Sequence, residues 1–311
     1  MQVYISGSLA YDRIMEFPGK FSEHILPEKI DRLNVSFNVN GMTEKFGGTA
    51  GNIAYSLGLL KETPIIVATA GRDFDRYASW LKENNLPLDG IRILPEEFTA
   101  GAYITTDMSD NQITCFNIGA MGHPSGYGFD DVETGRALAI ISPGCIEDMN
   151  TYSRDFKALD IPYIFDPGQS LPVLSGEQIA DMITGARMLI SNDYELELIR
   201  QKTGLDQADI LERTPVLVTT LGKKGSRVCS PDGEIELPAV PADQVVDPTG
   251  AGDAYRAGLI KGLVTGRTLE DAARMGAVCA SFAVARQGTQ EHAFSMEAFR
   301  VRYRNAFGKG M

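Results

Sequence analysis

The 311-residue chain has no excess of basic side chains. It contains 29 Lys and Arg against 41 Asp and Glu, a formal net charge of −12. Proteins that bind nucleic acid or anionic membrane surfaces usually carry a basic excess, because contacts with phosphates drive that binding. The acidic balance therefore argues against nucleic acid and membranes as partners, although a small polyphosphate bound by backbone amides stays compatible with it.

Long apolar runs and paired cysteines are also missing. Apolar runs such as 64–68 and 137–141 fall far short of the roughly 20 residues that a membrane-spanning helix needs. No basic side chain precedes Arg13, so the N-terminus predicts a strand and not a signal peptide. The four cysteines form no CxxC pair and the three histidines have no ligand spacing. These features argue against a zinc site or a disulfide framework and predict a cytoplasmic protein.

What the chain does have is an alternation of apolar, strand-like runs with amphipathic, helix-like segments. Hydrophobic residues make up 43% of it, enough for a sizeable core. Such alternation predicts a mostly parallel sheet with helices on both faces. The expected strands are 3–6, 64–69, 138–141, 163–165, 187–191 and 216–219, and the expected helices are 50–60, 74–84, 147–158 and 194–202.

Three regions depart from this alternation. Segments 31–46 and 99–118 have period-2 patterns and no helical stripe, which predicts antiparallel insertions forming a small sheet over one edge of the domain. Segments 226–230 and 234–237 flank an Asp-Gly pair, which predicts a hairpin.

The strongest motif is DPTGAGDAYRAG, which begins at Asp247. Its residues Gly250, Ala251 and Gly252 let backbone N–H groups approach a ligand closely, and Asp253 follows at the start of a helix-compatible stretch. A helix start binds anions, and a carboxylate beside it suits phosphoryl transfer to a hydroxyl group. An aspartate that caps a helix after a glycine turn explains the same residues, and spacing alone does not decide. No G-x-x-x-x-G-K-[ST] sequence occurs, which excludes a P-loop NTPase.

A second glycine-rich segment, KFGGTAGNIAYSLGLL, places Gly47 and Gly48 before an apolar helix. Asn52, near the helix start, offers both a donor and an acceptor to a bound hydroxyl. When this segment is taken alone, a tight strand-to-helix turn without a ligand is the better explanation of it.

Together, these segments resemble the PfkB (ribokinase-like) family of carbohydrate and nucleoside kinases. The family's Gly-Gly-x-x-x-Asn and D-x-x-G-x-G-D motifs are both present, and two further matches lie between them. Pro248 departs from the family, in which many members have Thr, and we expect it to stiffen the backbone only locally. The four matches are Gly47, Gly48 and Asn52; Asn192 and Glu195; the turn 222–225; and Asp247, Gly250, Gly252 and Asp253.

The resemblance implies a three-layer α/β/α fold with a mostly parallel central sheet and a small β-sheet lid. It implies a single domain over 1–311, with lid insertions at about 13–46 and 98–120. Asp253 would be the general base, and the amides of Gly250, Ala251 and Gly252 would form the anion hole. The cofactors would be ATP and Mg²⁺. The residues implied for ATP are Asn192, Thr220, Gly222 and Gly225, and Glu195 would hold Mg²⁺ through water.

The assignments of Asn192 and Glu195 have an alternative. Asn192 and Glu195 are also the residues of a helix cap and a first-turn acid. Many family members bind a monovalent cation such as K⁺ near the anion hole, and here it would involve Asp247, Thr249 and the loop 286–290.

The acceptor is the more open question. Asp12 matches the family's acidic residue for acceptor hydroxyls, and aromatic residues of the lid could stack a base. The same aromatic residues could simply pack the lid. Segments such as FNIGAM and DPTGAGDAYRAG are most similar to bacterial adenosine kinases of the family. The acceptor-site candidates are Ser8, Asp12, Ser36, Gly48, Asn52, Tyr103, Phe116, Met121 and Gln169.

The resemblance thus predicts transfer from ATP to the 5′-hydroxyl of adenosine, giving AMP. A sugar kinase similar to ribokinase or fructokinase, or a kinase of another nucleoside, is the alternative. A binding protein without catalysis is a third reading, against which Asp253 argues. The expected partners are small molecules, and an exposed lid sheet would offer a surface for a homodimer.

Overall fold

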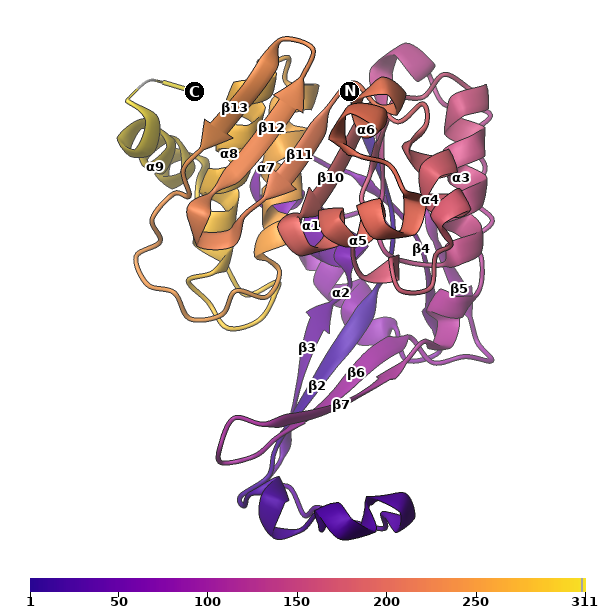
Figure 1. Ribbon diagram of the computed structural model, residues 1–311, viewed down its shortest axis with the longest axis vertical. Coiled ribbons are helices and arrows are strands. Elements are labelled where there is room, and N and C mark those ends of the chain that lie inside the picture. The colour runs from indigo at the N-terminus through magenta and orange to yellow at the C-terminus, as the bar shows by residue number, and fades with distance from the viewer. Residues whose placement is uncertain (309) are drawn as a thin grey trace.

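The computed structural model describes residues 1–308 and 310–311, and its main element is a nine-stranded sheet in the order β13-β12-β11-β10-β9-β8-β1-β4-β5 (Figure 1). Strands β11 to β5 run parallel, and β12 and β13 are antiparallel additions at one edge. The α/β prediction and the hairpin are confirmed. The strands are β1 Gln2–Ser6, β4 Ile65–Gly71, β5 Ile91–Leu94, β8 Ala137–Ile141, β9 Tyr163–Phe165, β10 Met188–Asn192, β11 Leu217–Thr220, β12 Ser226–Ser230 and β13 Gly233–Leu237.

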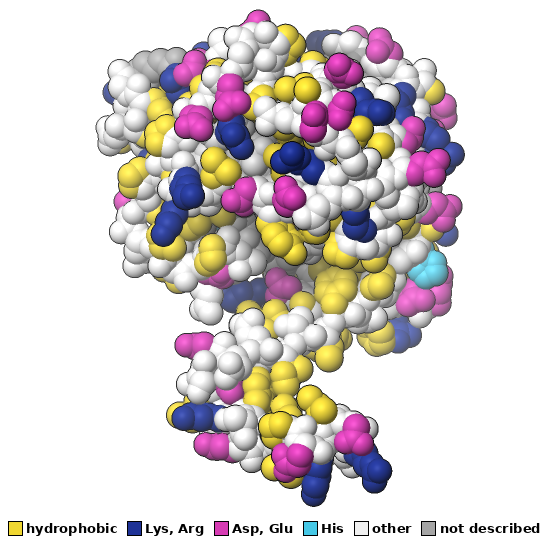
Figure 2. All heavy atoms as spheres, viewed as in Figure 1, with side chains coloured by type: hydrophobic (Ala, Val, Ile, Leu, Met, Phe, Trp, Pro, Cys, Tyr) yellow, Lys and Arg dark blue, Asp and Glu magenta, His cyan; other side chains and the backbone are white. Residues whose placement is uncertain are grey.

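A second, four-stranded sheet forms the lid, in the order β3-β2-β6-β7. Strands β2 and β6 pair in parallel, and the other two pairs are antiparallel. The lid projects from the body in Figure 1, and Figure 2 shows a recess between them. The strands are β2 Ala10–Glu16, β3 Met42–Gly47, β6 Ala100–Thr106 and β7 Gln112–Asn117.

The prediction of sheet structure over 31–46 is wrong for residues 31–41. These residues hold the end of a 3-10 turn, Pro27–Arg32, followed by irregular chain. The alternation itself is real, because residues 35, 37 and 39 are half-buried and their neighbours are exposed. Phe37 packs on Phe17 and Phe21, so side-chain contacts and not a strand partner account for the pattern.

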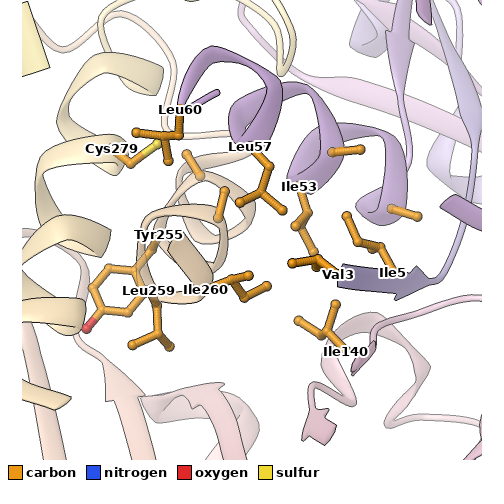
Figure 3. Close-up of a cluster of buried hydrophobic side chains, with 14 of the residues drawn as sticks. Val3, Ile5, Ile53, Leu57, Leu60, Ile140, Tyr255, Leu259, Ile260 and Cys279 are labelled. Carbon is orange, nitrogen blue, oxygen red and sulfur yellow. The ribbon is translucent and has the colours of Figure 1, made fainter. Parts of the chain in front are cut away.

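Helices cover both faces of the main sheet. Alternate residues of each parallel strand point to opposite sides, so the sheet contributes side chains to two cores. Val3 and Ile5 of β1 face one core, and Tyr4 faces the other. Figure 3 shows the first core, where side chains of α1, α7 and α8 meet those of β1 and β8. The helices are α1 Thr49–Leu59, α2 Asp75–Glu83, α3 Ile146–Ala158, α4 Gly176–Ile183, α5 Asp193–Thr203, α6 Gln207–Arg213, α7 Ala251–Val264, α8 Leu269–Ala283 and α9 Met296–Phe307.

Burial on both faces explains why the parallel strands consist of continuous apolar runs. Each fully buried Leu or Ile side chain contributes about 1.5–3 kcal/mol to folding relative to an exposed one. Within the described part of the chain, every helix is too short or too polar to cross a bilayer.

Candidate active site

Asp253 lies in the first turn of α7, directly after a glycine-rich turn. Gly250 has a φ of +77°, and a Cβ atom there would lie 2.9 Å from Cγ2 of Thr289. A glycine is therefore required at this position, because of both backbone strain and space. The turn places the N-terminus of α7, with its positive dipole end, next to the Asp253 carboxyl group. Of the three expected anion-hole amides, that of Ala251 donates to the carbonyl of Pro248 at 3.2 Å.

The carboxyl group of Asp253 is held by Asn52, whose Nδ2 donates to Oδ2 of Asp253 at 2.8 Å. Burial raises the pKa of Asp253 to about 7, against the lowering effects of the Arg256 charge and the Asn52 hydrogen bond. A general base works best when its pKa lies near the working pH. Asp253 is thus poised to accept a proton near neutral pH.

Asn52 is itself oriented by a chain of buried hydrogen bonds. Nε2 of Gln290 donates to Oδ1 of Asn52 at 3.1 Å and to the hydroxyl of Tyr77 at 2.6 Å. Nε1 of Trp80 donates to Oε1 of Gln290 at 2.9 Å. Because an indole N–H can only donate, the amide of Gln290 has one orientation, and this leaves Nδ2 of Asn52 to face Asp253. Sequence reasoning named Gln290 only as the end of the cation loop, and it missed Tyr77 and Trp80.

An ion pair between Arg256 and Asp166 lies beneath the same turn. Asp166 follows β9, both side chains are buried, and a Cβ atom on Gly252 would lie 2.8 Å from Nη1 of Arg256. Burial alone would lower the pKa of Arg256, but the charge and hydrogen bond of Asp166, together with the charges of Asp253 and Glu195, outweigh burial and raise that pKa. Arg256 therefore puts a permanent positive charge one helical turn from Asp253. Sequence reasoning missed this pair, whose members lie 90 positions apart.

A cleft of about 740 Å³ separates the lid from the loops beside α7. Burial and the neighbouring charge of Asp247 raise the pKa of Asp12, which lies on the lid wall of the cleft. A Cβ atom on Gly47 would lie 2.8 Å from Oδ2 of Asp12, so the glycine leaves room for that carboxylate. The lid wall includes Asp12, Ile14, Glu16, Lys45, Ile104 and Thr106, and the body wall includes Val246, Asp247, Thr249, Gln287, Gly288 and Thr289.

The structure brings only some of the acceptor-site candidates together. Phe116 is paired with Ala102, which is paired with Asp12, so the three residues share one face of the lid sheet. Tyr103 lies on the opposite face, where its hydroxyl accepts a hydrogen bond from Arg13 at 2.9 Å. Of the acceptor-site candidates, Asp12 alone is among the described residues that line the cleft. Ser36 is exposed at the lid tip, Met121 is half-buried and Gln169 is exposed.

Two further candidates support the start of α1. Oγ of Ser8 accepts a hydrogen bond from the backbone N–H of Thr49 at 3.0 Å and is buried. Gly48 has a φ of +87°, and a Cβ atom there would lie 2.5 Å from the carbonyl oxygen of Ser8. Both residues therefore place the backbone that carries Asn52.

The residues expected at ATP lie at the carboxyl ends of two neighbouring strands. Asn192 ends β10 and pairs with Thr220 at the end of β11. The side chains of Asn192 and Glu195 form a reciprocal cap of α5, at 2.7 and 2.8 Å, so the capping role is real. One carboxylate oxygen of Glu195 takes no part in the cap. The charge of Glu195 also contributes to the raised pKa of Asp253, which indicates that the two groups are near one another.

Glycines shape the turn beyond β11. Gly222 has a φ of +56° and open space around it. Gly225 has a φ of +97°, and a Cβ atom there would lie 1.9 Å from the carbonyl oxygen of Leu237. Packing against the hairpin therefore accounts for Gly225 without a ligand.

The chain is similar to known kinases over most of its length. Residues 18–295 match the pfkB family carbohydrate kinase domain. The chain is 33% identical to the nucleoside kinase of Methanocaldococcus jannaschii over 270 residues, covering 85% of this chain and 87% of that one. It is similar in structure to the Burkholderia thailandensis nucleoside kinase in complex with inosine, with a TM-score of 0.86, 37% identity and 99% of each chain covered. The same enzyme in complex with ADP-inosine gives a TM-score of 0.84 and 38% identity, covering 99% of this chain and 97% of that one.

Proposed function

The chain belongs to the pfkB family of carbohydrate kinases, and on that premise we propose that it transfers the γ-phosphoryl group of ATP to a hydroxyl of a nucleoside. The observation that carries the proposal is the half-buried Asp253 at the N-terminus of α7, whose carboxyl group is bound by Asn52. A base and an anion-binding helix end at one point are what transfer to a hydroxyl requires.

In this mechanism Asp253 takes the proton of the acceptor hydroxyl as its oxygen attacks the γ-phosphorus, and the ADP oxygen leaves in line. The amides of Gly250 and Gly252 and the dipole of α7 stabilise the charge on the transferring group. Arg256 is held behind the turn by Asp166 and adds a fixed positive charge there. Asn52 keeps the carboxylate of Asp253 turned toward the acceptor.

Magnesium would enter with ATP. Among the described residues, no group of three or more His, Cys, Asp or Glu could hold a metal ion. This fits a metal carried mainly by phosphate oxygens, with Glu195 and Asn192 reaching it through water. When bound, the ion neutralises phosphate charge. Thr220 and Gly222 would line the nucleotide site.

For the acceptor we propose a purine nucleoside, with adenosine as the first candidate. The carboxylate of Asp12 can accept hydrogen bonds from two vicinal ribose hydroxyls, and Phe116 is on the same lid face to cover the base. The inosine complex of the Burkholderia relative supports a purine nucleoside without favouring adenosine. The homodimer and the cytoplasmic location stay predictions.

The test is a comparison of kcat/KM for adenosine, inosine, cytidine, ribose and fructose, with ATP and Mg²⁺ saturating and product measured by chromatography. We expect purine nucleosides to exceed both sugars by more than about tenfold, since a site that pairs with a base loses binding energy without one. Faster turnover of ribose or fructose would contradict the proposal.

A further inference from the structure

The loop 286–290 was expected to help bind a monovalent cation together with Asp247 and Thr249. Three oxygen atoms of this region already accept hydrogen bonds within the chain. Oδ1 of Asp247 accepts the N–H of Thr249 at 2.9 Å, and Oδ2 accepts the N–H of Gly288 at 3.0 Å. The carbonyl of Gln287 accepts a hydrogen bond from Nζ of Lys45 at 2.9 Å. The expected site therefore already receives a positive charge from the protein.

The fit between Lys45 and the loop is close. Lys45 lies on β3, beside Asp12 on the cleft face of the lid sheet, and reaches across to the body. A Cβ atom on Gly288 would lie 2.8 Å from Cδ and 3.3 Å from Nζ of Lys45, and Gly288 has a φ of +97°. Glu291 is the only carboxylate of the described residues within ion-pair distance of Lys45, at 3.4 Å, and it is half-exposed.

This loop supports both halves of the catalytic arrangement. Thr289 packs against Gly250 in the turn before α7, and its hydroxyl donates to the carbonyl of Phe46 on β3 at 3.0 Å. Gln290 orients Asn52, which binds Asp253. A charge that fixes the loop thus acts on the anion hole and on the base together.

We propose that the ammonium group of Lys45 is a built-in replacement for the monovalent cation, so that phosphoryl transfer by this chain needs no added K⁺. A resident ammonium also disfavours a second cation at the same oxygens, because like charges a few ångströms apart repel. Lys45 is a positioning residue in this account. Only the kinetic part of the test rests on the proposed kinase function.

The experiment compares the wild type with Lys45→Met, which keeps the apolar stem and removes the charge. Lys82→Met, at an exposed position near the end of α2, is the matched control. Glu291→Gln tests whether the ion pair at the rim, and not the contact with Gln287, matters. Activity and the unfolding midpoint are measured in choline chloride and in KCl at equal ionic strength.

We expect less than about a twofold effect of K⁺ on kcat for the wild type, Lys82→Met and Glu291→Gln. Lys45→Met should lose about tenfold or more in choline and regain part of it in K⁺, the size expected for a lost charge-assisted hydrogen bond. K⁺ should also raise the unfolding midpoint of Lys45→Met alone, as binding to the folded state does. This readout does not require a substrate.

Three results overturn the proposal. One is a wild type whose activity needs K⁺, and another is a Lys45→Met variant with full activity in choline. The third is a folded Lys45→Met variant whose unfolding midpoint does not respond to K⁺. If no nucleoside is phosphorylated by any variant, the proposed function fails, while the unfolding measurement still decides the role of Lys45.

Discussion

The body side and the lid side of the candidate active site differ in how their residues are held. On the body side, Asp253, Asn52 and Gln290 form one chain of hydrogen bonds, anchored by Trp80 and Tyr77. On the lid side, the position of a residue depends on its place in a four-stranded sheet, and Phe116 at the edge strand is 50% exposed. The body side is therefore set for one chemical step, whereas the lid side can differ in the acceptor that it binds.

Among substitutions on the body side, Asp253→Asn should lower kcat the most. The amide keeps the shape of the side chain but cannot take a proton, so kcat should fall by about 10²–10⁴. Steady-state kinetics with adenosine would measure this, and calorimetry would check that nucleoside affinity changes little. Turnover near that of the wild type would show that another group is the base.

The pH dependence of kcat/KM tests the role of Asp253 without a mutation. Only the ionised form of Asp253 can accept a proton, and burial raises the pKa of Asp253 to about 7. The value of kcat/KM should therefore fall about tenfold per pH unit below that pKa and level off above it. A flat profile between pH 5.5 and 8 would contradict this assignment, provided that the unfolding midpoint stays constant over the range.

Gln290→Leu should have an intermediate effect, because it releases Asn52 without touching Asp253. The variant leaves the N–H of Trp80 and the Oδ1 of Asn52 without their partner. We expect a loss in kcat of about tenfold, of the size produced by breaking one buried hydrogen bond. Gln290→Glu keeps the acceptor for Trp80 but loses the donor to Asn52, so it should resemble Gln290→Leu in kcat. A rise in KM with an unchanged kcat would instead place Gln290 in substrate binding.

Substitutions on the lid side should have the smallest effects on kinetics. Two aromatic residues on opposite faces of the lid sheet allow a direct comparison. Phe116→Ala should raise the KM for adenosine by about 5–10-fold and leave the KM for ATP unchanged, in line with about 1–3 kcal/mol for base stacking. Tyr103→Ala, which only removes a partner of Arg13, should leave both KM values within about twofold. Equal losses in the two variants would mean general damage to the lid.

Most central strands could be predicted from the sequence because burial on both faces leaves an uninterrupted apolar run, and the expected strand 163–165 coincides with β9. The edge strand β5, Ile91–Leu94, was missed since it is short and half-exposed. Helices α4 and α6 were also missed, although capping boxes at Ser175 and Asp206 are signals that could have found them.

The candidate site divides in the same way. The glycine turns could be recognised because backbone geometry allows little else at Gly250 and Gly48. Gln290 could not be foreseen, since its partner Asn52 is 238 positions away and only the fold brings the two together. Tyr103 was misplaced because its face depends on strand register, and a shift of one residue reverses the side to which a chain points.

The tip of the lid has a consequence for limited proteolysis. On one side the N–H of Phe21 donates to Asp107 at the turn between β6 and β7, and on the other the N–H of Asn40 donates to the carbonyl of Glu16. The segment 25–34 between these anchors is almost entirely exposed. A cut there would leave both new ends pinned to the sheet, so a nicked chain would keep its lid and migrate as one particle until it is denatured.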